Sequence, residues 1–181
     1  MRAGEARYQH EIGSIGLALR FIQLEARTST IRAFTGLSGD RIRKLSHQYE
    51  NPRNRHRGKS PQQASYFIRS AKVRHQASFL GGVLYSCGLV LNDPAAEAGF
   101  ASLATGKLLF DAYEYYRQVV SAPAISFEYA VFLAQCLQRG DQLRLVCCAN
   151  CNIPLLAERL PEGPRLCDYC EPDFRRRRAG W

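Results

Sequence analysis

The sequence lacks any long hydrophobic run: no segment of its 181 residues approaches the roughly 18 uncharged apolar residues of a membrane-spanning helix. The amino-terminal segment, Met1 to Arg7, also lacks the apolar stretch of a secretory signal peptide. These absences predict a cytoplasmic protein that does not bind membranes. Disulfide bonds are rare in that reducing compartment, so the seven cysteines call for another explanation.

Histidine is scarce, and this argues against an enzyme. The four histidines, His10, His47, His56 and His75, lie in polar or basic stretches, and we expect no carboxylate to orient an imidazole ring for catalysis. A catalytic nucleophile needs a positioned general base, and the sequence offers no such pair. We therefore expect no enzymatic activity.

Negative charge is also in short supply, with 16 acidic residues against 25 basic ones and a formal net charge of +9. The excess is concentrated in two segments. The first, 41–59, contains Arg41, Arg43, Lys44, Arg53, Arg55, Arg57 and Lys59, and the second contains Arg175, Arg176, Arg177 and Arg178. Clusters of this kind bind phosphate backbones, so both segments are predicted to contact nucleic acid.

The sequence has no internal repeat, no coiled-coil heptads and no β-hairpin signal before Leu143. Periodic apolar positions instead predict helices. They are expected over 11–27, as two short helices over 28–49, from 60 onward, from 92 onward, over 108–120 and over 126–139. The first helix is predicted to bury Ile12, Ile15, Leu19, Ile22 and Ala26. The helix over 108–120 carries Leu109, Ala112, Tyr113 and Tyr116 on one side, and the helix over 126–139 is predicted to bury Phe127, Ala130, Val131, Ala134 and Leu137. Ser60 is expected to cap the long third segment, which Gly81 and Gly82 could bend or break.

These patterns predict a mainly α protein. A helical domain over 1–140 is expected to precede a small module over 141–181, in which any strands are short. Cys87 and Cys136 lie in apolar surroundings and are predicted to be core residues.

The segment 28–49 matches the pattern of a helix-turn-helix with Gly36 in the turn. Apolar residues that would join the two helices are Ile31, Leu37, Ile42 and Leu45. In the second helix, Ile42, Leu45 and Tyr49 form the predicted inner face, while Asp40, Arg43, Lys44 and His47 point outward, where DNA would lie.

Ser38 is expected to cap this second helix, and Arg43 can donate two hydrogen bonds to guanine. The competing interpretation is a pair of ordinary bundle helices with a solvated charged face.

Four cysteines form two C-x-x-C pairs, Cys148 with Cys151 and Cys167 with Cys170. Each pair can direct two thiolates at one metal ion, and the proline- and glycine-rich segment between the pairs can fold back to close the shell. This spacing predicts one structural zinc ion. Two disulfides or a thioredoxin-like redox motif are the alternatives, but they call for a secreted chain or a single C-x-x-C in a βαβ unit. Cys147 could replace Cys148 only through a less usual spacing.

The order of these features resembles the FlhC family, the flagellar master transcriptional activators of proteobacteria. The resemblance rests on the segment Arg20 to Arg27, the helix-turn-helix ending in Arg41 to Leu45, the helical body, and the terminal cysteine pairs followed by arginines. It implies zinc bound by all four paired cysteines. It also implies a hetero-oligomer with the smaller protein FlhD that binds flagellar promoter DNA and recruits RNA polymerase.

The alternative is that the chain is an RNA-binding or scaffold protein whose fold is stabilised by zinc. Tyr113, Tyr115 and Tyr116 could stack on bases, but at helical spacing we expect them in the core or in a partner interface. Such an interface is predicted between 103 and 137 and would include Phe110, Tyr115 and Phe132.

Overall fold

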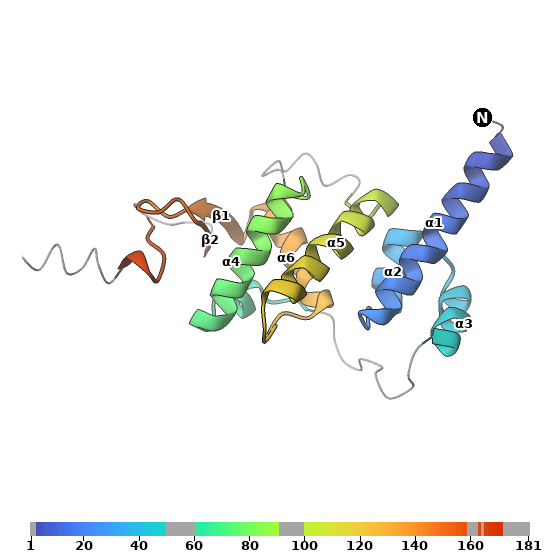
Figure 1. The fold of residues 1–181 in the computed structure, drawn as a ribbon, viewed down its shortest axis with the longest axis horizontal. Helices are drawn as coiled ribbons and strands as arrows, with labels where there is room; N and C mark the ends of the chain where they lie inside the picture. The colour runs from blue at the N-terminus through green and yellow to red at the C-terminus, as the bar shows by residue number, and fades with distance from the viewer. Residues whose placement is uncertain (1–2, 50–60, 91–99, 159–162, 164, 172–181) are drawn as a thin grey trace, which may run out of the picture.

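A computed structural model gives the fold and describes residues 3–49, 61–90, 100–158, 163 and 165–171. Among these residues the protein is mainly helical, as predicted. The elements are α1 (Ala3–Gln23), α2 (Thr28–Thr35), α3 (Gly39–Tyr49), the 3-10 helix η2 (Ala64–Phe67), α4 (Ala71–Ser86), α5 (Leu103–Val119), α6 (Phe127–Arg139), β1 (Leu143–Cys147) and β2 (Pro154–Glu158). Figure 1 shows α1 to α3 at one end of the long axis, α4 to α6 in the middle, and the two strands beyond them. In the described part of the chain, no helix is both long and apolar enough to cross a membrane.

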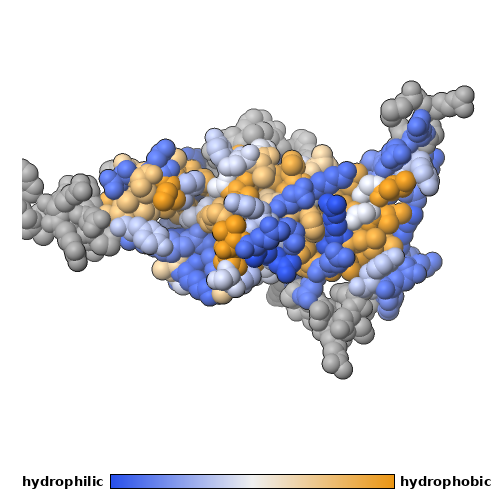
Figure 2. All heavy atoms as spheres, in the orientation of Figure 1, coloured by the Kyte–Doolittle hydropathy of each residue, from blue (hydrophilic) through white to orange (hydrophobic). Residues whose placement is uncertain are grey.

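The buried face of α1 agrees only in part with the predicted one, since Ile22 is buried and Leu19 and Ala26 are partly buried against the core. Leu17, Ala18, Phe21 and Ile22 are buried, whereas Ile12 is 49% exposed. The helix also starts well before residue 11 and ends at Gln23. Apolar residues lie on more than one face of α1, and periodicity alone does not select among them. The packing of α2, α3 and α5 against α1 makes that selection. Figure 2 shows hydrophobic surface remaining on α1, at the right of this view.

The predicted start of the long helix at residue 60 is wrong. Ser60 lies outside the described residues, and Gln63 is in extended backbone rather than helix. The chain forms η2 instead, and α4 begins at Ala71 with the Ser70 hydroxyl accepting the Val73 N–H at 3.4 Å. Packing explains the difference, because η2 buries Phe67 completely and stacks Tyr66 on Tyr129.

The glycine pair in α4 neither breaks nor ends the helix, which runs on to Ser86. The β-hairpin packs closely against these positions instead. A Cβ atom at Gly81 would lie 2.5 Å from Leu145 Cδ1, and one at Gly82 would lie 3.3 Å from Pro154 Cγ. The two glycines therefore provide room for the hairpin on α4.

The last two helices follow their predicted pattern. The α5 helix begins earlier than expected, at Leu103, but buries the predicted side with Leu109 and Ala112. The α6 helix buries its predicted inner residues Phe127, Ala130, Val131, Ala134 and Leu137 and ends at Gly140, whose φ is 62°. Glycine suits this left-handed helix end because it has no Cβ to clash. The helix that was predicted to start at Asn92 lies outside the described residues.

A partly buried carboxylate connects α6 to the start of α2. Glu128 Oε1 accepts the Arg27 N–H at 2.8 Å, and Oε2 accepts the Thr30 hydroxyl at 3.0 Å. A negative charge is favourable at this place because the first N–H groups of a helix carry a partial positive charge. The contact helps to fix the α2–α3 pair relative to the helical body.

Replacing Gly106 with alanine tests the packing among α1, α2 and α5. The new Cβ would lie 2.6 Å from Leu17 Cδ2 and 3.2 Å from Phe34 Cβ. We expect Gly106→Ala to lower the free energy of unfolding by about 1–3 kcal/mol through overpacking. Gly16→Ala is the matched control, because nothing lies within 4 Å of its Cβ position. It should instead stabilise α1 by about 0.5–1 kcal/mol.

Urea unfolding monitored by circular dichroism measures both effects. A Gly106→Ala variant as stable as the Gly16→Ala variant would contradict this packing.

Candidate functional site

The structure brings the four paired cysteines into one cluster, as predicted. Cys148 follows β1 directly, Cys151 lies in the turn before β2, and Cys167 and Cys170 return from the following segment. Their four Sγ atoms lie within 4.8 Å of one another, and those of Cys151 and Cys167 are 3.6 Å apart. This cluster of Cys148, Cys151, Cys167 and Cys170 is called the metal centre below.

The geometry of the metal centre fits a tetrahedral metal ion. Four thiolates about 2.3 Å from zinc stand about 3.8 Å from one another, close to the separation of Cys151 and Cys167. A disulfide would need about 2.05 Å, and all seven cysteines are free thiols. Cys148, Cys167 and Cys170 are buried, whereas Cys151 is exposed. The four cysteines can therefore hold one metal ion between them.

Hydrogen bonds to sulfur join the two pairs. The Cys167 N–H donates to Cys148 Sγ at 3.3 Å, and the Asn150 side-chain amide donates to Cys170 Sγ at 3.3 Å. The Ala149 N–H also donates to the Arg165 carbonyl at 2.9 Å. Donors of this kind orient metal ligands and stabilise negative charge on them. The amide of Asn150 was not recognised in the sequence, because its partner Cys170 belongs to the other pair.

The pKa values of the Cys148 and Cys170 thiols are shifted in opposite directions. Backbone N–H groups of Cys151, Cys167 and Asn150 lower the pKa of the Cys148 thiol to about 6. The Asn150 amide lowers the pKa of the Cys170 thiol, but the sulfur atoms of Cys167 and Cys151 outweigh it and raise that pKa to about 12. Four thiolates crowded together repel one another, so full ionisation of this cluster calls for a cation among them.

The helix α4 holds the metal centre against the helical body. The Ser78 hydroxyl accepts the Leu156 N–H of β2 at 2.9 Å, and Arg74 donates to Asp168, between the second cysteine pair, at 2.5 Å. Hydrogen bonding to Arg74 lowers the pKa of the Asp168 carboxyl below its usual value. Leu143 and Leu156 of the hairpin belong to the same buried cluster as the helices. Sequence analysis missed Arg74, Ser78 and Asp168, because their partners are distant in the chain. For the same reason its expectation of no carboxylate beside a histidine is wrong at His75, whose Nε2 lies 2.7 Å from Asp168 Oδ2.

The remaining cysteines lie away from the metal centre or point out of it. Cys136 is buried in the core, as predicted, whereas Cys87 is only partly buried. Cys147 is the last residue of β1, pairs with Pro154 of β2 and is exposed. It is not part of the four-sulfur cluster.

The second candidate site is formed by α2 and α3, which lie where the sequence predicts them. Gly36 joins them with a φ of 69°, and Ile31, Leu37, Ile42 and Leu45 all pack into the core. The prediction for Tyr49 is wrong, since its side chain is 61% exposed. Tyr49 is the final residue of α3, beyond the part that packs against α1 and α2. Ser38 precedes α3, and its hydroxyl accepts the Arg41 N–H at 3.4 Å.

The predicted DNA-contacting side chains of α3 are exposed. These are Asp40, Arg41, Arg43, Lys44 and His47, and Ser38 is exposed before them. Arg41 is held by Glu11 of α1 at 2.6 Å, and Arg43 pairs with Asp40 one turn away. Both ion pairs are open to solvent, so they hold these arginines only weakly. The remaining predicted contacts, Arg53, Arg55, Arg57, Lys59, Arg175, Arg176, Arg177 and Arg178, lie outside the described residues.

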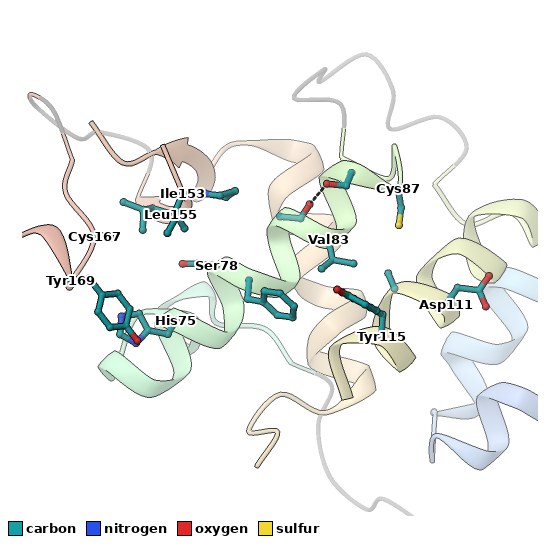
Figure 3. Close-up of a pocket in the computed structure, with 15 residues that line it drawn as sticks. His75, Ser78, Val83, Cys87, Asp111, Tyr115, Ile153, Leu155, Cys167 and Tyr169 are labelled. Atoms are coloured by element: carbon teal, nitrogen blue, oxygen red, sulfur yellow. Dashed lines mark hydrogen bonds between the residues drawn. The ribbon is translucent and has the colours of Figure 1, made fainter. Parts of the chain in front are cut away.

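An apolar groove of about 750 Å³ is lined by α4, α5, the β-hairpin and the second cysteine pair. Figure 3 shows Tyr115 approaching it from α5, Ile153 and Leu155 from the hairpin, and Tyr169 from the second cysteine pair. Of the three tyrosines considered for base stacking, Tyr113 and Tyr116 are buried and only Tyr115 is exposed. Phe110 and Phe132, predicted at a partner interface, are partly buried against the core.

Comparison with known proteins adds no further identification. No family model matches the chain, and no curated protein matches it.

Proposed function

We propose that this protein is a DNA-binding transcriptional activator of flagellar operons, the function that its resemblance to FlhC implies. The observation that carries the proposal is the two-sided character of α3. Its inner residue Ile42 is fully buried, while Arg43 and Lys44 project from the opposite side into solvent. A recognition helix needs this arrangement, because one face must anchor it while the other enters the major groove.

The proposed cofactor is one structural zinc ion in the metal centre. Four cysteine thiolates would complete its tetrahedral shell and leave no open position for a reacting water molecule. This is consistent with a non-enzymatic, cytoplasmic protein. Zinc would connect the hairpin to the second cysteine pair, which has little regular structure of its own among the described residues.

The proposed partners are an FlhD-like small regulator, promoter DNA and RNA polymerase. A single recognition helix contacts only a few base pairs, and proteins of this kind gain specificity by combining modules on successive turns of DNA. The formal net charge of +9 favours phosphate contacts that hold the protein on DNA whatever the sequence. The basic segments 53–59 and 175–178 are proposed to provide them.

The burial of Tyr113 and Tyr116 disfavours the RNA-binding alternative, because base stacking needs exposed rings. Competition between promoter duplex, random duplex and single-stranded RNA separates the two functions. Preferential binding of the RNA would contradict the proposal.

Substitutions in α3 test the recognition role. In complex with the partner, Arg43→Ala and Lys44→Ala should each reduce the preference for promoter over random DNA, by about 1–3 kcal/mol for a lost bidentate contact. Arg117→Ala is the matched control, because Arg117 is also exposed and paired with an acid three residues away, but lies on α5. The Arg117→Ala variant should keep the full preference for promoter over random DNA.

Binding titrations at several salt concentrations measure both affinity and the number of phosphate contacts. If the α3 variants discriminate as well as the Arg117→Ala variant, α3 does not read the promoter sequence.

A further inference from the structure

The side chain of Asp168, inside the second cysteine pair, is held by the helical body. Arg74 Nη2 donates to Asp168 Oδ1 at 2.5 Å, and His75 Nε2 lies 2.7 Å from Oδ2. The His75 ring also stacks on Tyr169, with ring centroids 5.6 Å apart. Figure 3 shows these two rings side by side at one end of the apolar groove. Both carboxylate oxygens of Asp168 therefore face α4.

The two cysteine pairs differ in how they are supported. Cys148 and Cys151 lie at the turn of the β-hairpin, where the ladder from Leu143–Glu158 to Cys147–Pro154 holds the backbone. In the described residues around Cys167 and Cys170 there is no strand: a tight turn leads into the helical residues Cys170 and Glu171, whose N–H groups donate to the Cys167 carbonyl. The contacts of Asp168 and Tyr169 with α4 attach this second turn to the rest of the protein.

We propose that Arg74 and His75 are positioning residues of the metal centre. By holding Asp168, they fix the second turn so that the sulfur atoms of Cys167 and Cys170 stand at bonding distance from the metal. The proposal rests on the metal site of the proposed function and adds to it a link between metal retention and the packing of α4. Residues that orient metal ligands typically contribute about 10–100-fold in affinity.

The link also acts in the opposite direction. Arg74 and His75 lie in the first two turns of α4, near its amino-terminal end. The carboxylate of Asp168 places a negative charge beside the Arg74 guanidinium and the His75 ring, and the ion pair with Arg74 orders that side chain. Loss of the metal releases the second turn, so the start of α4 loses this charge and its partner for Arg74.

Metal competition against a chromophoric chelator tests the proposal in the full chain. Using Zn²⁺ and Co²⁺, we expect Arg74→Ala and His75→Ala to bind each metal about 10–100-fold more weakly than the unmodified protein. Lys72→Ala is the matched control, because Lys72 is exposed on the same part of α4. The metal affinity of the Lys72→Ala variant should equal that of the unmodified protein. The cobalt–thiolate absorption at saturation should remain, since all four ligands are still present.

A double-mutant cycle shows whether Arg74 acts through Asp168. Asp168→Ala should weaken metal binding, and the combined Arg74→Ala and Asp168→Ala variant should lose little more than Asp168→Ala alone. Hydrogen exchange over residues 71–78 should rise on metal removal in the unmodified protein, and less so in Arg74→Ala. If the alanine variants lose helix content, Arg74→Lys and His75→Gln replace them, because these substitutions nearly keep the side-chain volume. Their losses of metal affinity should be smaller but should rank in the same order as those of the alanine variants.

Three outcomes would overturn the proposal. Unchanged metal affinity in both the Arg74 and His75 variants would leave the metal centre in place but remove the role of α4. Fully additive losses in the cycle would show that Arg74 does not act by holding Asp168. An unmodified protein that binds neither Zn²⁺ nor Co²⁺ would refute the metal centre itself.

Discussion

Cys167→Ser is expected to abolish tight zinc binding and to loosen the structure from Leu143 to Glu171. Binding of structural zinc contributes about 10–16 kcal/mol in small zinc modules, and that free energy is largely folding free energy. The hairpin has only five residues in each strand, so it depends on the metal and on its packing against α4. The helical core should be less affected, because most of its buried residues lie in α1 to α6.

Elemental analysis and hydrogen exchange measure this prediction. We expect one zinc per chain in the unmodified protein and none retained in Cys167→Ser, with faster exchange over 143–171. Cys147→Ser is the matched control, because Cys147 is exposed beside the first pair but lies outside the four-sulfur cluster. Loss of zinc in the Cys147 variant, or retention of one zinc in the Cys167 variant, would show that the ligands are assigned incorrectly.

The second large effect is expected from the partner. Alone, the chain should bind promoter and random DNA with similar affinity, because one recognition helix contacts few bases and the positive charge acts on any duplex. With an FlhD-like regulator, the preference for promoter DNA should rise to about 10³-fold or more, as in specific complexes that combine several modules. Footprinting and titration at fixed salt, with each protein alone and with the mixture, measure the change.

The mass of the mixture should show a hetero-oligomer. A complex carrying Arg43→Ala should keep this mass and lose part of the promoter preference, which separates assembly from recognition. An isolated chain that already protects the promoter with full specificity would contradict the prediction.

Helix type and approximate position were predictable wherever one apolar stripe dominates, as in α5 and α6. The prediction was only partly right in α1: Ile22 is buried as predicted, but apolar residues occupy several faces, and the contacts with α2, α3 and α5 determine that Leu17 and Phe21 are buried as well. It also failed at the start of α4, because the cap at Ser60 was a local signal that tertiary packing of Phe67 overrode. The glycines at 81 and 82 were interpreted as a weak point in the helix, although their function depends on the hairpin packed against them.

The sequence alone determined the donor set of the metal centre, because two C-x-x-C pairs allow few arrangements in which four thiols meet. It also determined the separation of apolar and charged sides in α3, since helical periodicity places Ile42 opposite Arg43 and Lys44. Only the tertiary structure decided how the metal centre is attached to the helical body. The contacts of Asp168 with Arg74 and His75, and of Ser78 with Leu156, join residues far apart in the chain, and no local pattern encodes such distant pairs.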